Sequence, residues 1–296
     1  MNISKLISKF DNEVKNFVLL NLKGNDIDNL TEVRLRVGQN IQLIFNNYEK
    51  DIEGFVLTLK HINDTVVSLA DFSLYAIEED MKNGFFTVSG GHRIGVCGKV
   101  ISDNQRVLKI TSLSSIIIRI AREVKNVSDN ISPLFSPLKS ALIVSPPACG
   151  KTTMLRDLTR NISNRGYKVT VIDERSEIAG MYKGIAQNDL GRRTDVLDSC
   201  PKNIGLNIAL RCTSPDIVVL DEIGTDEDIE GLYRAFNSGI KVLATVHSEN
   251  LTTLRKKIGF EKLLSSDEIE LFIFLSKEKG EYRSKVYDKF DWEVLL

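Results

Sequence analysis

One stretch of the sequence carries residue types that bind phosphate. Gly150, Lys151 and Thr152 match the end of the P-loop pattern G-x-x-x-x-G-K-[ST], and an apolar run, ALIV, comes directly before the loop. In such a loop the backbone N–H groups surround the phosphates, the lysine reaches the β- and γ-phosphates, and the hydroxyl binds Mg²⁺. The sequence therefore predicts a site for ATP and Mg²⁺. The loop residues that we expect to contact the nucleotide are Ser145, Pro146, Pro147, Ala148, Cys149, Gly150, Lys151, Thr152 and Thr153.

Ser145 stands where the pattern has its first glycine. A serine can take that place only if the backbone there has a negative φ, because a positive φ costs a residue with a β-carbon on the order of 1 kcal/mol. Pro146 and Pro147 stiffen the loop and lower the entropy lost when it is ordered. We therefore expect Ser145 to change the loop geometry rather than to remove the site.

Two adjacent acids leave a second apolar run, IVVLDEIG, about 70 residues further on. Asp221 is placed to hold the Mg²⁺ shell, and Glu222 is placed to polarise a water molecule. Burying either carboxylate unpaired would be costly, so a purely structural role does not explain the pair. A base beside the metal-binding acid favours attack by water and predicts an ATPase rather than a kinase.

Two further polar segments follow apolar runs. VIDERSEIAG carries Asp173 and Glu174, which form either a second acidic box beside the nucleotide or a solvated strand-to-loop turn. ATVHSEN carries Thr245 and His247, at the carboxyl end of a predicted strand, where ligands bind in parallel sheets. A single histidine is more often structural, so its role stays open from the residues alone.

The elements that must position these residues alternate between apolar strands and amphipathic helices. From residue 141 on, strands are predicted at ALIV, KVTVI, IVVL and IKVLATVH, and helices from Lys151, over DEDIEGLYRAFNSG and over LTTLRKKIGF. Short, fully apolar strands separated by helices indicate a parallel sheet covered on both faces. The C-terminal part is therefore predicted to be an α/β domain.

The N-terminal part has a different pattern. Residues 3–20 place apolar side chains three and four apart, which predicts an amphipathic helix packed on a core. EVRLRVG and IQLIF read as strands, and GFFTVSGGHRIGVCGKV as a hairpin that turns at Gly90 and Gly91. Asn, Ser and Pro then gather before residue 141. We predict a smaller α+β domain over residues 1–126, a linker over 127–140 and a second domain over 141–296.

Composition limits the class of protein. The 296 residues include 42% hydrophobic and 27% charged residues, as in folded water-soluble proteins. The 39 basic and 40 acidic side chains nearly balance within each half of the chain, which does not favour general nucleic-acid binding. No apolar run approaches the length of a membrane span, and the N-terminus has no signal-peptide core, so a cytoplasmic protein is expected. The four cysteines are scattered singly, which predicts neither disulfides nor a zinc site.

Taken together, these motifs resemble the stage III sporulation protein AA family, relatives of the type II and type IV secretion and pilus motor ATPases. The resemblance covers nearly the whole chain and includes RRTDVLDSCPKNIGLNIALRCTSPDIVVLDEIG. It implies a RecA-like P-loop domain, and Ser145 departs from the glycine usual in the family. By position, Walker A falls on Gly150, Lys151 and Thr152, the acidic box on Asp173 and Glu174, Walker B on Asp221 and Glu222, and the histidine box on His247. The implied catalytic residues are Glu222, Glu174 and His247, with Thr152 and Asp221 on Mg²⁺.

The resemblance also implies how such a motor works. The chain would form a homo-hexamer on the mother-cell side of the channel between mother cell and forespore, recruited to the membrane by membrane-embedded channel proteins. Motors of this kind complete the site with arginines from the other domain or a neighbouring subunit. The candidates in this sequence are Arg93, Arg119, Arg192 and Arg193.

Two other functions stay open at this point. RecA-like sheets also serve nucleic-acid translocases and helicases, which need basic and aromatic residues interleaved on one surface. A nucleotide-gated scaffold that binds ATP but hardly hydrolyses it is the other alternative, and Ser145 is the feature that suggests it.

Overall fold

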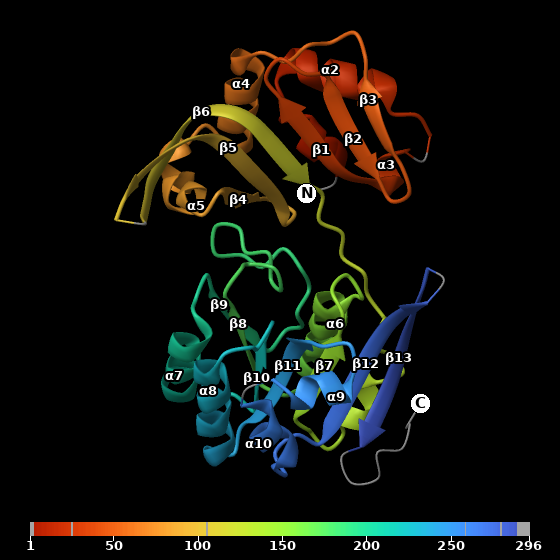
Figure 1. The fold of residues 1–296 in the computed structure, drawn as a ribbon, viewed down its shortest axis with the longest axis vertical. Coiled ribbons are helices and arrows are strands. Elements are labelled where there is room, and N and C mark those ends of the chain that lie inside the picture. Colours follow the sequence, from red (N-terminus) through yellow and green to blue (C-terminus); the bar gives the residue numbers. More distant parts are fainter. Residues whose placement is uncertain (1–2, 25, 105, 258, 279, 289–296) are drawn as a thin grey trace. The chain divides into compact units, whose positions relative to one another are not determined.

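The computed structural model describes residues 3–288, apart from 25, 105, 258 and 279 (Figure 1). The chain forms two compact units. The first comprises Met1–Arg122 together with Tyr182–Gln187, and the second comprises Glu123–Met181 together with Asn188–Leu296. Each has its own hydrophobic core.

The first unit is built on a six-stranded sheet in the order β3-β2-β1-β6-β5-β4, in which every neighbouring pair is antiparallel. The strands are β1 Leu30–Arg36, β2 Ile41–Phe45, β3 Glu49–Ile52, β4 Phe85–Val88, β5 His92–Asp103 and β6 Arg106–Arg119. The helices are α1 Ile3–Ile7, α2 Asn12–Asn21, α3 Asp26–Asn29, α4 Leu59–Leu69, the 3₁₀ turn η1 Leu74–Ile77, and α5 Glu78–Lys82. The predicted α+β class of this part is confirmed.

The single helix predicted over residues 3–20 is wrong. The segment forms two helices, because the chain turns after α1 and Asp11 caps a new helix. The Asp11 carboxylate accepts hydrogen bonds from the N–H groups of Glu13 (3.0 Å) and Val14 (3.3 Å), which are otherwise unpaired at a helix start. The apolar stripe still packs on the core as predicted, with Leu6, Ile7, Phe10, Val14 and Val18 buried.

The strands and the hairpin predicted in this unit are confirmed. EVRLRVG falls largely within β1 and IQLIF is β2, and the two pair antiparallel. Val88 pairs with His92 across the turn that contains Gly90 and Gly91. Both glycines have a positive φ (88° and 75°), which a residue with a β-carbon rarely adopts.

The second unit is built on a seven-stranded sheet in the order β13-β12-β7-β11-β10-β8-β9 (Figure 1). Neighbours from β12 to β9 run parallel, and β13 pairs antiparallel with β12 at one edge. The strands are β7 Ala141–Ser145, β8 Val169–Asp173, β9 Thr194–Asp198, β10 Ile217–Leu220, β11 Lys241–His247, β12 Leu271–Glu278 and β13 Glu281–Asp288. The helices are the 3₁₀ turn η2 Ser132–Phe135, α6 Lys151–Asn164, α7 Lys202–Cys212, α8 Asp226–Asn237, α9 Leu251–Arg255 and α10 Phe260–Ser265.

Helices cover both faces of this sheet, as the apolar strands predict. Leu142 and Val144 of β7 pack in one cluster with side chains of α7, α8 and α10. Ala141 and Ile143, which point to the opposite face, pack in a second cluster with α6 and η2. All five residues of β7 and of β8 are buried. The α/β class predicted for this part is confirmed.

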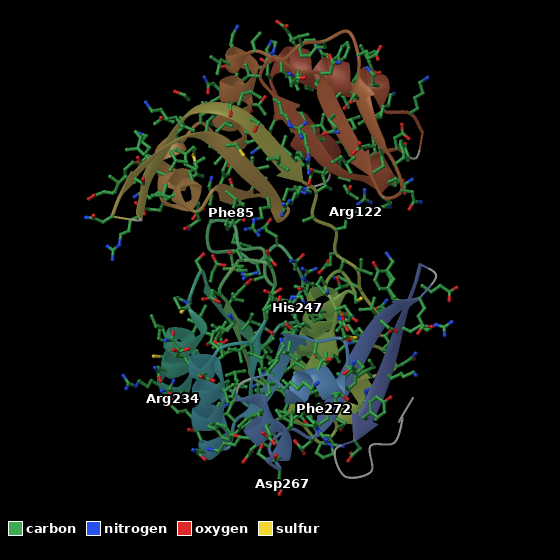
Figure 2. The ribbon with its side chains drawn as sticks, in the orientation of Figure 1. Phe85, Arg122, Arg234, His247, Asp267 and Phe272 are labelled. Atoms are coloured by element: carbon green, nitrogen blue, oxygen red, sulfur yellow. The ribbon has the colours of Figure 1, made fainter. Side chains whose placement is uncertain are left out.

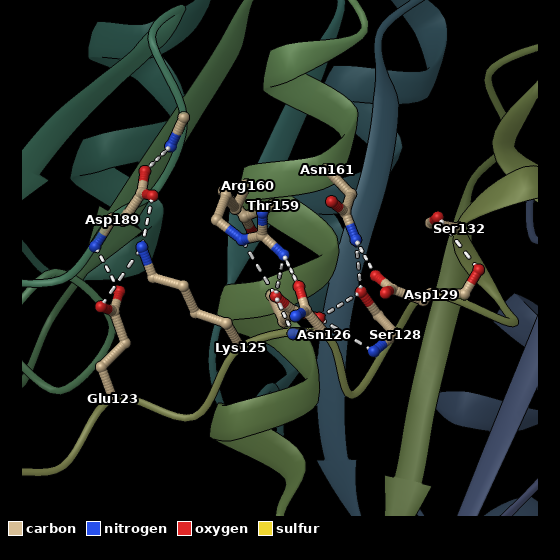
Figure 3. A network of polar contacts seen from close by, with 12 residues as sticks. Glu123, Lys125, Asn126, Ser128, Asp129, Ser132, Thr159, Arg160, Asn161 and Asp189 are labelled. Carbon is tan, nitrogen blue, oxygen red and sulfur yellow. Dashed lines mark hydrogen bonds and ion pairs between the residues drawn. The ribbon is translucent and has the colours of Figure 1, made fainter.

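Residues that precede β7 are fastened to α6 by a polar network (Figure 3). The buried Asp157 carboxylate accepts hydrogen bonds from the N–H groups of Asn126 (3.1 Å) and Ser128 (2.9 Å) and from the Ser128 hydroxyl (2.8 Å). Arg160 pairs with the same carboxylate at 2.6 Å. Burial acts to raise the pKa of Asp157, but these partners outweigh it and hold the pKa below its ordinary value.

Within the described part of the chain, no helix combines the length and the apolar character needed to cross a membrane.

Candidate nucleotide-binding site

The loop predicted to bind phosphate connects β7 to α6 at the carboxyl end of the parallel strands. Ser145 is the last residue of β7 and is almost fully buried. It does not have a positive φ, so the condition under which serine can replace the first glycine of the pattern is met. The loop instead turns at Ala148 (φ 59°) and at Gly150 (φ 84°), directly before α6. Ala148 therefore carries the backbone strain, on the order of 1 kcal/mol.

The sequence predicts that α6 begins at the loop with one apolar side, and the structure has this arrangement. Met154, Leu155, Leu158 and Ile162 are buried. The first N–H groups of α6 therefore lie next to the loop, where a helix start attracts anions.

The Lys151 ammonium lies between the loop and β11. It donates hydrogen bonds to the carbonyl oxygens of Pro146 (3.1 Å) and Ser145 (3.3 Å), and it lies 2.9 Å from Nδ1 of His247. Its side chain is almost fully buried, and burial lowers its pKa. Because an ammonium group has no lone pair, Nδ1 of His247 accepts this bond and the imidazole proton sits on Nε2.

The second imidazole nitrogen reaches the acid that we expect to activate water. His247 Nε2 lies 2.8 Å from Oε1 of Glu222, so Lys151, His247 and Glu222 form one hydrogen-bonded chain. Figure 2 labels His247 among the side chains of the second unit. The histidine predicted only as a candidate therefore contacts both the loop lysine and the second acid of IVVLDEIG.

Glu222 is held by its backbone as well as its carboxylate. Its φ is 51°, and its N–H group donates to Asp221 Oδ1 (3.0 Å) and to the Thr245 hydroxyl (2.8 Å). Oε2 accepts a hydrogen bond from Arg175 at 2.8 Å. Burial acts to raise the pKa of Glu222, but the hydrogen bond from His247 and the nearby positive charges hold it below its ordinary value. The carboxylate is therefore ionised, as a proton acceptor must be.

The two groups expected to hold Mg²⁺ lie together. Thr152 donates its hydroxyl proton to Asp221 Oδ2 at 2.9 Å, and the Thr245 hydroxyl donates to the other oxygen, Oδ1. Within the described residues, no three His, Cys, Asp or Glu side chains gather as a metal site. Mg²⁺ in nucleotide sites is usually held by one or two carboxylates plus phosphate oxygens and water, so one hydroxyl and one carboxylate fit this ion.

The acidic segment after β8 has two different roles in the structure. Asp173 is buried, and its carboxylate accepts hydrogen bonds from the N–H groups of Glu177 (2.9 Å), Ile178 (2.9 Å) and Ala179 (2.8 Å). Its burial raises its pKa to about 6. The Glu174 carboxylate pairs with Lys202 of α7. Asp173 therefore fixes the backbone conformation of the segment, while Glu174 is exposed to solvent.

A small pocket joins this segment to the Walker B acids. Its lining residues are Asp173, Glu174, Arg175, Glu177, Lys202, Asp221 and Glu222. The structure therefore brings together the acids that the sequence analysis singled out. The catalytic roles assigned to Glu222, Glu174 and His247 stay predictions.

The four arginines expected to complete the site are divided between the two units. Arg93 and Arg119 belong to the first unit, where Arg93 stacks on Phe85 and Arg119 lies 3.6 Å from Glu32. Arg192 and Arg193 belong to the second unit and are exposed. Which arginine completes the site stays a prediction.

Arg156 was not predicted from the sequence as part of the site. It lies one turn beyond Thr152 on α6 and donates hydrogen bonds to the carbonyl oxygens of Glu177 (2.8 Å) and Ile178 (2.9 Å). Burial lowers its pKa. No motif identifies Arg156, because its partners are backbone atoms about 20 residues away. The contact of Arg175 with the Glu222 carboxylate was also missed, because the two residues are 47 positions apart in the sequence.

Comparison with known proteins identifies the family. Residues 6–291 match the family described as sporulation stage III, protein AA. The chain is 36% identical over 275 residues to stage III sporulation protein AA of Bacillus subtilis, covering 90% of this chain and 89% of that protein.

Solved structures share the fold. DotB, an ATPase of Legionella pneumophila, has a TM-score of 0.60 at 16% identity, covering 88% of this chain and 78% of that chain. The pilus retraction motor PilT with bound ADP has a TM-score of 0.61 at 16% identity, covering 97% and 82%. With the match over residues 6–291, these findings show that the chain belongs to the stage III sporulation protein AA family.

Proposed function

We propose that this chain is a cytoplasmic motor ATPase that binds ATP with Mg²⁺, hydrolyses it to ADP and phosphate, and powers or assembles the channel complex between mother cell and forespore. The observation that carries the proposal is the hydrogen-bonded cluster at the carboxyl end of β7, β10 and β11. It joins the loop lysine Lys151, the acids Asp221 and Glu222, and His247. The pilus motor with the same fold was solved with ADP, which supports a nucleotide at this loop.

Lys151, Asp221 and Glu222 each have a role in the proposed reaction. The loop N–H groups and Lys151 hold the phosphates, and Lys151 leaves its contacts with Pro146 and His247 to do so. Thr152 and Asp221 would hold Mg²⁺, which supplies charge neutralisation on the phosphates. Glu222 accepts the proton of the attacking water.

The proposal includes how the protein assembles. We propose a homo-hexamer on the mother-cell side, recruited to the membrane by membrane-embedded channel proteins, with domains at 1–126 and 141–296 joined by 127–140. The family supports the sporulation setting. An arginine from the other domain or a neighbouring subunit would complete the site, and the candidates are Arg93, Arg119, Arg192 and Arg193.

ATP turnover by the purified chain with Mg²⁺ tests the proposal. Glu222→Gln keeps the shape of the side chain but removes the proton acceptor, so we expect ATP binding to persist while turnover falls by a factor of about 10² to 10⁴. Lys151→Ala should lose ATP binding. Glu230→Gln, on the exposed side of α8, is the matched control. An active Glu222→Gln variant would contradict the assignment of the base, and a wild-type chain without ATP affinity would contradict the function.

A further inference from the structure

The loop that follows β8 is fastened at its far end. Asp173 accepts three hydrogen bonds from the N–H groups of residues 177–179, and Arg156 donates two hydrogen bonds to the carbonyl oxygens of Glu177 and Ile178. Both the N–H groups and the carbonyl oxygens of this short backbone segment are therefore hydrogen-bonded to side chains. Because Arg156 belongs to α6, its hydrogen bonds connect the loop after β8 to the helix that follows the predicted phosphate-binding loop.

Arg175 extends from this fastened loop to Glu222. Its guanidinium donates to Oε2 at 2.8 Å, while His247 holds Oε1 at 2.8 Å. The two carboxylate oxygens are thus held by different parts of the fold, the loop after β8 and the end of β11. The Glu222 side chain alone can occupy several rotamers. Two contacts on separate oxygens select one of them.

We propose that Arg175 is a positioning residue that orients the Glu222 carboxylate toward the attacking water, and that Arg156 keeps Arg175 in place by fastening its loop to α6. This inference rests on the proposed ATPase function, since it assigns a purpose to the orientation of Glu222. Arg175 acts through Glu222 and accepts or donates no proton in the reaction. Displacing a reacting group by about 1 Å costs a factor of about 10² in rate.

A surface ion pair is the competing explanation for Arg175. Its side chain is 62% exposed, and exposed pairs contribute little to folding stability. In that case the removal of Arg175 would leave catalysis unchanged. Because the side chain is exposed, truncation of Arg175 leaves the core intact, so a change in turnover would not result from misfolding.

Steady-state ATP turnover of Arg175 variants separates the two explanations. We expect Arg175→Ala to lower kcat by a factor of about 10 to 100 and to leave KM for ATP within about twofold. Arg175→Lys should recover part of the loss, because it keeps a positive donor on a flexible stem. Arg234→Ala, which removes an exposed arginine of α8 in the same unit, should match the wild type.

The role of Arg156 is tested by combining variants. Arg156→Met removes both hydrogen bonds to the loop, and we expect kcat to fall about as far as in Arg175→Ala. The double variant should be no slower than the slower single variant, since both changes release the same contact. Arg156→Lys keeps the charge but cannot reach two carbonyls with a planar fork, so its kcat should be intermediate. Circular dichroism confirms folding, and if Arg156→Met does not fold, Arg156→Lys replaces it in the double variant.

The outcomes distinguish this inference from the function on which it rests. A wild-type chain without turnover contradicts the ATPase function itself. If the wild type turns over ATP and Glu222→Gln does not, but Arg175→Ala is as fast as the wild type, the inference is wrong and the function stands. A raised KM with unchanged kcat would make Arg175 a nucleotide-binding residue and also overturn it. Fully additive losses in the double variant would overturn the role of Arg156.

Discussion

Asp173 makes the stability of the second unit depend on pH. Its side chain is about 1% exposed, and burial raises its pKa from 3.8 in an unfolded chain to about 6. The folded chain therefore binds this proton more tightly than the unfolded chain. The resulting stabilisation is fully present below pH 3.8 and is lost as pH rises through about 6. A shift of about two pKa units corresponds to about 3 kcal/mol.

The variant Asp173→Asn isolates this contribution. Its amide does not titrate, so the difference in free energy of unfolding between wild type and variant should move against the wild type by about 2 kcal/mol between pH 4 and pH 7, because part of the full contribution is already lost at pH 4. Urea unfolding, followed by circular dichroism at several pH values, measures the difference. Asp195→Asn on the exposed edge strand β9 is the control, and its difference from the wild type should lack this step.

The three hydrogen bonds that Asp173 accepts act against burial, and the same measurement shows which effect on its pKa is larger. Backbone N–H donors stabilise the charged carboxylate and lower its pKa, which opposes burial. If the difference between wild type and Asp173→Asn is flat from pH 4 to pH 7, or moves in favour of the wild type, these donors outweigh burial. The carboxylate would then be ionised throughout this range.

Three other changes test separate parts of the molecule. Asp157→Ala leaves the N–H groups of Asn126 and Ser128 and the Arg160 guanidinium without their acceptor, so urea unfolding should show a loss of about 3 to 5 kcal/mol, whereas the exposed Asp129→Ala should change little. Alkylation of Cys149, a half-buried loop residue next to the start of α6, should block nucleotide binding in a fluorescent-ATP assay; ATP should protect it, and full binding after complete modification would contradict the loop placement. Turnover per chain should rise with protein concentration if subunits complete the site for one another, and a constant value would contradict a shared site.

The sequence predicts the second unit well because its signals are local. The inner parallel strands β7, β8, β10 and β11 are buried on both faces, so they read as short apolar runs. The phosphate-binding loop is one continuous segment, and its residue spacing alone indicates its chemistry. The strands β9, β12 and β13 were not predicted. β9 is an edge strand whose residues are all at least partly exposed, so its apolar signal is weak.

In the first unit, the spacing of apolar residues led to a wrong helix boundary. The apolar spacing of residues 3–20 continues across the break between α1 and α2, because both helices pack on the same core. Asp11 ends that continuity by capping α2, and an aspartate within a helical pattern is also common on exposed faces. Spacing therefore predicted the buried face correctly and the helix boundary wrongly.

In the candidate site, too, local sequence patterns were predictive and contacts between distant segments were not. Motifs predicted the residues that would touch the nucleotide or its metal ion, since these follow the ends of strands and are close to fixed sequence patterns. The residues that orient them were not predictable. Arg175 and Glu222 are separated by 47 positions and become neighbours only because β8 and β10 pair in parallel. Arg156 meets its loop only because α6 packs on a face of the sheet that includes β8. The orientation of Glu222 thus depends on strand order, which side-chain chemistry alone does not reveal.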